Sequence, residues 1–342
     1  MLGRPIEYLS MPNHPLSQTQ LPKVRPTGAK HQATRLEDIG AEATKYVQQA
    51  KSENTRRAYT ADWADFSSWC EKYRRTPLPA LPDTVAYYLA DRSQDLKTST
   101  LQRRLATISE AHRIAGFESP TRSAQVKLVW AGIRREKGVA QNHKKPTLTK
   151  HIRAMVENLS DGLLGVRDRA LILLGFAGAM RRSELVGLDV TDVAVADEGL
   201  VVNIRKSKTD QTGQGRKIGI PFGSQPETCP VRAVLAWIEE AEIEEGGPLF
   251  RSVNKHEHVM ESRLSDKAVA DVVKRSLVAA GKSARGFAAH SLRAGLITQA
   301  AMSGVSERAI QDQSGHKSLT VMRRYIRDGS LFRENAAAKV GL

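Results

Sequence analysis

Apolar residues recur at the spacing of a helix face through the first part of the chain. The clearest stripe lies between residues 59 and 73, where apolar side chains stand three or four places apart. Its members are Tyr59, Trp63, Phe66, Cys70 and Tyr73. Comparable stripes predict further helices over residues 36–50, 83–89, 98–116 and 126–138. We therefore predict a helical domain over residues 36–138, with these aromatic side chains in its core.

The pattern changes in the second part of the chain, where helical stripes give way to short runs of β-branched residues. Ala170–Phe176 is apolar throughout and predicts a buried helix. Strands are predicted at Val190–Val195, Leu200–Arg205 and Arg216–Ile220, with a hairpin turn at Gly213 and Gly215. Helices are predicted after Cys229-Pro230 and at Ala268–Ala279, Ser291–Met302, Glu307–Gln313 and Thr320–Ile326. Residues 149–342 should form a mixed domain, mainly helical, with one small antiparallel sheet.

Two segments lack a periodic apolar pattern and mark the limits of these domains. Residues 1–35 contain five prolines and predict a mobile tail. Residues 139–148 predict a linker, because Pro146 disfavours helix before it and Lys144-Lys145 keep the segment solvated. The tail's basic residues fit phosphate contacts and a solvated tail equally well.

Charge points to a polyanionic partner. The chain has 52 Lys and Arg against 37 Asp and Glu, a formal net charge of +15, and residues 1–150 carry +11 of it. Nucleic acid is the simplest such partner, and a merely soluble basic protein is the alternative. Arginine pairs lie opposite the apolar face of two predicted helices. They could contact phosphates and guanine edges in a major groove, or simply form a solvated surface. These pairs are Arg56-Arg57 and Arg103-Arg104.

Several classes of site are disfavoured. Cys70 and Cys229 are the only cysteines, too few for a disulfide scaffold or a zinc site. His256 and His258 have no further ligand at metal-site spacing, so we expect a polar loop there. Neither a carboxylate cluster nor a Walker-type loop accompanies the motifs below, so no metal and no nucleotide cofactor is expected. Without a transmembrane-length run or a signal pattern, we expect a soluble cytoplasmic protein.

The second domain contains the residue types that phosphodiester cleavage needs. Attack on phosphorus builds negative charge, and arginine binds two phosphate oxygens without losing its own charge. Arg181 and Arg293 are the candidates, and Glu184 could fix an arginine through a salt bridge. His290 shares a helix face with Arg293 because the two stand three residues apart. Each of these residues alone has an ordinary structural explanation.

A nucleophile and an acid complete the set. Tyr325 follows His316 by nine residues. Its hydroxyl, with a pKa near about 10, needs neighbouring cations and a base to attack phosphorus at neutral pH. Lys208, on the predicted hairpin, is the best donor of a proton to the leaving 5′ oxygen, although a solvated lysine is the alternative. His316 follows Gly315 and could equally be a helix-capping histidine.

The order Arg, Lys, His-x-x-Arg, Gly-His, Tyr is specific, and here the chain resembles the tyrosine recombinase/integrase family, most closely its compact Cre-like members. The resemblance covers about residues 36–335, and Leu128–Glu136 is similar to the last helix of a Cre-like core-binding domain. Two positions depart from the family pattern. Ala179 stands where a glycine is common, and Ser314 stands where an apolar residue is common.

The resemblance implies a helical, SAM-like core-binding domain and an α+β catalytic domain that close on DNA as a C-shaped clamp. It implies catalytic roles for Arg181, Lys208, His290, Arg293, His316 and Tyr325. The intermediate would be a 3′-phosphotyrosine with a free 5′-hydroxyl. Four protomers would recombine two double-stranded, inverted-repeat sites through a Holliday junction. The protein would be associated with the bacterial nucleoid or encoded by a mobile element.

The resemblance also implies where the chain would contact DNA and its neighbours. Arg57 and Arg103 would enter the major groove from the first domain, and Lys267 from the second. The segment Leu331–Val340 would dock on a neighbouring protomer. Two alternatives stay open: a type IB topoisomerase, and a non-catalytic DNA-binding protein of the same fold.

Overall fold

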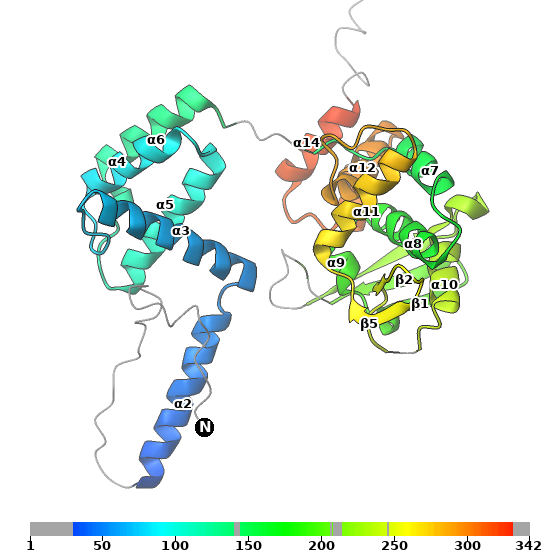
Figure 1. Cartoon of the computed structure of the whole chain (residues 1–342), viewed down its shortest axis with the longest axis horizontal. Helices are drawn as coiled ribbons and strands as arrows, with labels where there is room; N and C mark the ends of the chain where they lie inside the picture. Colours follow the sequence, from blue (N-terminus) through cyan, green and yellow to red (C-terminus); the bar gives the residue numbers. More distant parts are fainter. Residues whose placement is uncertain (1–29, 140–143, 206, 208–213, 245, 331–342) are drawn as a thin grey trace, which may run out of the picture. The chain divides into compact units, whose positions relative to one another are not determined.

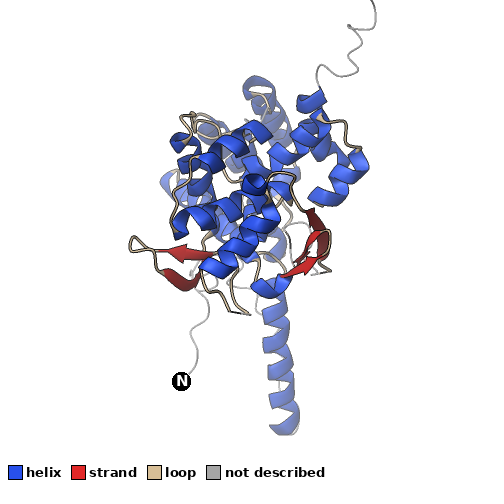
Figure 2. Cartoon of the chain, turned by 90° about the vertical axis from the view of Figure 1, so that its right-hand side faces the viewer, coloured by secondary structure: helices blue, strands red, loops and turns tan. Residues whose placement is uncertain are grey.

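The computed structural model describes residues 30–139, 144–205, 207, 214–244 and 246–330 (Figure 1). The chain divides between Gln141 and Asn142 into two compact units, inside the segment predicted as a linker. Helices dominate the described residues, and strands form only two small antiparallel sheets (Figure 2). The predicted fold class, mainly helical with little sheet, is confirmed.

The first unit consists of helices in the order that the apolar stripes predict. They are α2 (Lys30–Gln49), α3 (Glu53–Lys72), α4 (Pro82–Ser93), α5 (Thr98–Ile114), the 3₁₀ turn η2 (Pro120–Arg122) and α6 (Ala124–Lys137). Helix α2 begins at Lys30, inside the stretch predicted as a mobile tail. Ser52 caps α3, and its hydroxyl accepts a hydrogen bond from the Thr55 N–H.

Aromatic side chains form the core of this unit. Phe66 and Tyr88 are fully buried with their ring centroids 5.0 Å apart in an edge-to-face arrangement. Trp69 packs against the same Tyr88 ring at 5.4 Å. By contrast, α2 exposes the apolar side chains of Ile39 and Tyr46. The stripe on α3 is therefore a core face, whereas the stripe on α2 is largely open.

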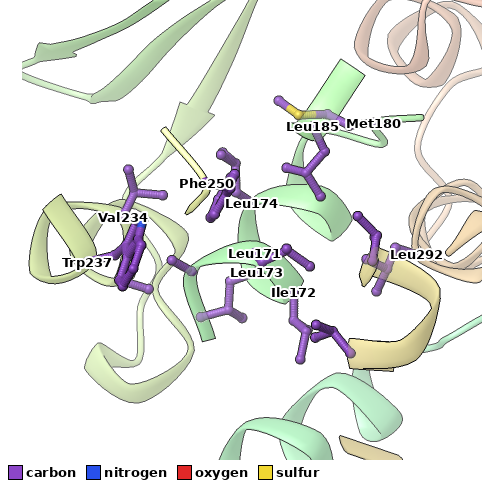
Figure 3. Close-up of a cluster of buried hydrophobic side chains, with 14 of the residues drawn as sticks. Leu171, Ile172, Leu173, Leu174, Met180, Leu185, Val234, Trp237, Phe250 and Leu292 are labelled. Atoms are coloured by element: carbon purple, nitrogen blue, oxygen red, sulfur yellow. The ribbon is translucent and has the colours of Figure 1, made fainter. Parts of the chain in front are cut away.

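The second unit is built around a central helix. Its helices are α7 (Thr149–Glu157), α8 (Leu163–Ala177), α9 (Arg182–Gly187), α10 (Pro230–Glu240), α11 (Asp266–Ala279), α12 (His290–Met302), α13 (Glu307–Ser314) and α14 (Leu319–Ser330). Helix α8 buries Leu171 and Leu174 completely, beside Trp237 of α10 and Leu292 of α12 (Figure 3). This core supports the segment after α8, which carries Arg181.

A three-stranded antiparallel sheet covers part of the core, with strand order β1 (Val193–Ala196), β2 (Gly199–Ile204), β3 (Arg216–Pro221). Val202 and Ile204 of β2 and Ile218 of β3 are buried, as the alternation of their apolar residues predicts. The predicted strand Val190–Val195 starts later. Its first residues form a 3₁₀ turn, in which Asp192 accepts a hydrogen bond from the Asp189 N–H.

A second hairpin, β4 (Arg251–Val253) and β5 (Val259–Arg263), was not predicted. Its strands contain few apolar residues, so no alternating pattern marks them in the sequence. The turn between them holds His256 and His258, as expected of a polar loop; the backbone N–H groups of both donate to the Asn254 side chain. Among the described helices, none is both long enough and apolar enough to cross a bilayer.

Candidate active site

A strained turn after α8 positions the first arginine. Gly178 ends the helix, and Ala179 then adopts φ +46°, a left-handed conformation that costs a residue with a Cβ about 1 kcal/mol. Glycine would adopt this conformation without that cost. The turn directs the Ala179 carbonyl toward Arg293, whose Nη1 donates to it over 2.7 Å. The two arginines are therefore linked through one short stretch of backbone.

Glu184 holds Arg181. The Glu184 side chain is fully buried; its Oε2 accepts from the Arg181 backbone N–H at 3.0 Å, and its Oε1 accepts from Arg181 Nη1. The salt bridge expected from the sequence is present. A buried carboxylate is costly unless a cation pairs with it, so Glu184 keeps Arg181 beside it. The two contacts fix the Arg181 guanidinium and the start of α9.

Arg293 lies under the site as a buried cation. It is 1% exposed, and Nη1 also donates to the Ser314 carbonyl at 2.6 Å. Burial, and then the positive charge of Arg181, lower the pKa of Arg293 to about 9. A bound anion would stabilise the charged form of Arg293 against its burial and against the repulsion from Arg181. The site is therefore suited to a phosphate.

His316 is held next to Arg293 as a neutral imidazole. Gly315 ends α13 in the left-handed conformation, φ +63°, and turns the chain so that Arg293 Nη2 lies 3.1 Å from His316 Nδ1. The Ser314 hydroxyl lies 2.8 Å from the same nitrogen. Burial, and then the charge of Arg293, lower the pKa of His316 to about 3. A neutral imidazole can accept a proton or donate a hydrogen bond.

Tyr325 of α14 reaches this group. Its hydroxyl lies 2.8 Å from Nε2 of His290, the first residue of α12, and its ring centroid lies 6.4 Å from that of His316. Met322, one turn earlier on α14, is fully buried and anchors the helix. A base is therefore within hydrogen-bonding distance of the tyrosine hydroxyl.

Six predicted residues come together: Arg181, Glu184, His290, Arg293, His316 and Tyr325. Lys208 lies outside the described residues, although the flanking strands β2 and β3 run beside the site. Within the described part of the chain, no three His, Cys, Asp or Glu side chains cluster as metal ligands.

Two residues of the site were not predicted as functional. Ser314, noted only as a departure from the family pattern, is buried and contacts the His316 ring. Arg216 lies beside Glu184, with its Nη2 3.6 Å from Glu184 Oε2. Its place in the alternation was a usable signal, since Arg216 falls on the same strand face as the buried Ile218 and Ile220.

The candidate DNA-contacting residues of the first unit differ in exposure. Arg57 is 70% exposed and pairs with Glu53 of its own helix. Arg103 is about half-exposed and makes two hydrogen bonds to the buried Asp62, at 2.8 and 2.9 Å. Arg104 is 12% exposed and donates to the Asp65 carboxylate at 2.6 Å. This geometry gives Arg104 a packing role inside the unit and leaves Arg57 more open to a ligand.

The other two candidates lie near the starts of their helices, one in each unit. Arg56 lies on α3, beside Arg57, and its backbone N–H donates to the Ser52 carbonyl at 3.0 Å. Lys267 is exposed in the first turn of α11, in the second unit.

The arrangement suits one kind of chemistry. A tyrosine hydroxyl, a histidine and two fixed guanidinium groups can bind a phosphodiester and transfer it to the tyrosine. The fold and the site thus define the class: an enzyme that breaks and rejoins a nucleic-acid strand through a tyrosine.

Comparisons with known proteins agree with this class. Residues 145–330 match the phage integrase family. An integrase/recombinase XerD homologue of Selenomonas ruminantium is 40% identical over 304 residues, which cover 88% of this chain and 89% of that protein. A tyrosine recombinase of Synechococcus elongatus is 29% identical over 291 residues, which cover 80% and 85% of the two chains.

Solved structures share the fold at low sequence identity. The XerH site-specific recombinase bound to a palindromic difH substrate has a TM-score of 0.63 at 16% identity, covering 88% of each chain. A lambda integrase dimer bound to a core site has a TM-score of 0.58 at 17% identity, covering 90% of this chain and 83% of that one. The chain belongs to the phage integrase family of tyrosine recombinases, which break and rejoin DNA strands.

Proposed function

We propose that this recombinase cuts DNA at specific sites through a 3′-phosphotyrosyl bond to Tyr325. The observation that carries the proposal is the 2.8 Å contact between the Tyr325 hydroxyl and His290 Nε2 beside two fixed arginines. The tyrosine oxygen bonds to phosphorus as the bond to the 5′ oxygen breaks. The free 5′-hydroxyl of a partner strand then attacks the phosphotyrosine, so no external energy source is needed.

Each residue has a role that its surroundings support. Arg181, held by Glu184, binds the nonbridging oxygens, and the buried Arg293 supplies fixed positive charge behind them. His290 takes the tyrosine proton, because its Nε2 is the hydrogen-bonding partner of the hydroxyl. The neutral His316 hydrogen-bonds the phosphate. We assign the proton for the leaving 5′ oxygen to Lys208, on the segment that joins β2 to β3.

Strand exchange in this proposal needs four protomers on two sites, each an inverted repeat, and passes through a Holliday junction. The segment Leu331–Val340, which directly follows α14, docks on a neighbouring protomer. A cavity of about 500 Å³ supports this idea, since its lining is mainly apolar. It includes Ile152, Phe176, Leu296 and Ile310.

Both units bind the duplex in this proposal and close on it as a clamp. Arg56, Arg57 and Arg103 face DNA from the first unit, and Lys267, exposed in the first turn of α11, from the second. If the substrate is genomic or mobile-element DNA, the protein acts in the bacterial cytoplasm. The net charge of +15 supports a phosphate-rich ligand.

Recombination in vitro tests the proposal. The substrates are two plasmids that each carry the DNA flanking the gene, searched for an inverted repeat, and the Tyr325→Phe variant is the control. We expect recombinant products and a four-way junction intermediate from wild type only. Relaxation of supercoiled DNA without recombinants would instead indicate a topoisomerase, and binding without either product would indicate a non-catalytic protein.

A further inference from the structure

Arg216 occupies a position where an arginine is costly. It is the first residue of β3, pairs with Ile204 across the sheet, and shares the inward face of the strand with Ile218 and Ile220. Its side chain is only 21% exposed. Arginine is seldom buried unless it is paired, because its charge must leave water.

The hydrogen bonds of Arg216 are incomplete. Nη1 donates to the Gln313 carbonyl at 3.1 Å, in the last turn of α13. Nη2 faces Glu184 Oε2 at 3.6 Å, beyond hydrogen-bonding distance, and neither Nε nor Nη2 has a hydrogen-bond partner among the residues that the structure describes. Each unsatisfied buried donor costs about 1–3 kcal/mol, which calls for an explanation.

The guanidinium also lies directly against the turn that carries His316. A Cβ added to Gly315 would lie 2.6 Å from Arg216 Nε and 3.0 Å from Cδ. The Gly315 backbone thus rests on the arginine with no room for a side chain. Burial lowers the pKa of Arg216, and the Glu184 carboxylate opposes that shift.

Arg216 therefore contacts two supports of the site at once. One is Glu184, the carboxylate that holds Arg181; the other is the Gln313–Gly315 turn that places His316. Because Nε and Nη2 are enclosed, these two donors are not available to a phosphate. The contacts of Arg216 therefore connect it to the site through Glu184 and the Gln313–Gly315 turn.

We propose that Arg216 is a positioning residue for the strand-cleavage reaction. This proposal rests on the proposed recombinase function. Arg216 braces Glu184 and the Gln313–Gly315 turn against β3, so that Arg181 and His316 face the phosphate together. A shift of about half an ångström closes the 3.6 Å gap into a charge-assisted hydrogen bond. Contacts of this kind are often long before substrate binds and shorten afterwards.

Arg216→Met and Arg216→Lys test the proposal in the full-length protein. The assay is the single-turnover rate of covalent-adduct formation on nicked DNA at saturating protein, with the Kd for the same DNA measured in parallel. Arg216→Met should slow adduct formation by roughly 10–100-fold and change Kd by less than about twofold. Lysine keeps the charge without the planar fork, so it should recover about threefold or more.

Arg275→Met is the matched control. Arg275 pairs with Asp168, a carboxylate 2% exposed and outside the site, so this variant also breaks an ion pair to a buried carboxylate. It should destabilise the protein and leave the adduct rate of the folded fraction unchanged. A wild-type rate for Arg216→Met, or an equal loss in both methionine variants at matched folded fraction, overturns the proposal.

A second measurement does not depend on DNA cleavage. The Arg181 Nε–H resonance of the DNA-free protein, assigned with Arg181→Lys, reports how Glu184 holds that guanidinium. We expect Arg216→Met to shift or broaden this resonance and Arg275→Met to leave it in place. An unchanged resonance contradicts the positioning role even if wild type cleaves DNA. Absence of any wild-type adduct, with the resonance shifted, contradicts the recombinase function instead.

Discussion

Truncation of Met322 should release the helix that carries Tyr325. Met322 is fully buried in a small cluster with Ile297, Ala301 and Ile310, separate from the main core of the unit. Polar contacts also hold α14: Arg323 Nη2 donates to Glu307 Oε2 at 3.0 Å, and Thr298 Oγ1 donates to the Tyr325 carbonyl at 3.4 Å. Met322 is the buried apolar anchor of the helix that carries the nucleophile, and its cluster is small.

The magnitude follows from the burial. Replacing a fully buried methionine with alanine costs about 2–5 kcal/mol. A loss of about 3 kcal/mol lowers the ratio of docked to undocked α14 about 150-fold. Because the main core contains neither Met322 nor its partners, the loss should appear as local opening of α14 before global unfolding.

Hydrogen exchange distinguishes local opening of α14 from global unfolding of the unit. We expect amides of α14 in Met322→Ala to exchange roughly 100-fold faster than in wild type, with α8 unchanged. The rate of adduct formation should fall with the docked population. Val321→Ala is the matched control, because its side chain is on the same helix and 44% exposed. Exchange of α14 within about threefold of wild type in Met322→Ala would refute the reasoning.

Three further predictions concern charged and titratable groups. Glu184→Gln should lower the free energy of unfolding by about 2–3 kcal/mol and slow adduct formation at least about tenfold, because Arg181 loses a buried charged partner; urea unfolding and single-turnover cleavage measure both, and a loss below about 0.5 kcal/mol speaks against this role. His316 should make the protein less stable in acid. Its pKa is lowered to about 3 from 6.5, so the unfolded chain binds a proton below about pH 6.5 that the native state does not. After allowance for partial exposure, wild type should lose about 1 kcal/mol between pH 7.5 and pH 5.5 that His316→Gln does not lose; equal pH slopes in denaturant titrations would contradict this. Arg104→Ala should destabilise the first unit by about 1–3 kcal/mol, whereas Arg57→Ala should mainly weaken DNA binding; thermal melts and salt-dependent binding titrations distinguish the two, and the reverse pattern would contradict the assignment.

Local patterns predicted the helices of the second unit closely. Helix α13 was expected at Glu307–Gln313 and spans Glu307–Ser314, because Ser306 caps its start and Gly315 ends it in the left-handed conformation. Helix α12 was expected at Ser291–Met302 and begins one residue earlier, at His290. Caps and apolar spacing act within a turn or two of helix, so one sequence contains all the information needed.

Pairings between distant residues were beyond such patterns. Arg104 was expected to face DNA, and its partner Asp65 lies 39 residues away in the sequence. Arg216 bonds a carbonyl 97 residues away, and the β4–β5 hairpin pairs strands with few apolar residues. A sequence pattern shows which face of an element is polar, but the partner of that face depends on the packing of the whole unit.

The central claim is that Tyr325 forms the covalent bond to DNA. A substrate nicked close to the cleavage site traps the intermediate, because the short 5′-hydroxyl strand diffuses away before it can rejoin. Incubation with wild type, digestion and mass spectrometry should locate a nucleotide phosphate on the peptide that contains Tyr325, and Tyr325→Phe should bind the same DNA without an adduct. An adduct that persists in Tyr325→Phe, or a phosphate on another residue of wild type, would contradict the account.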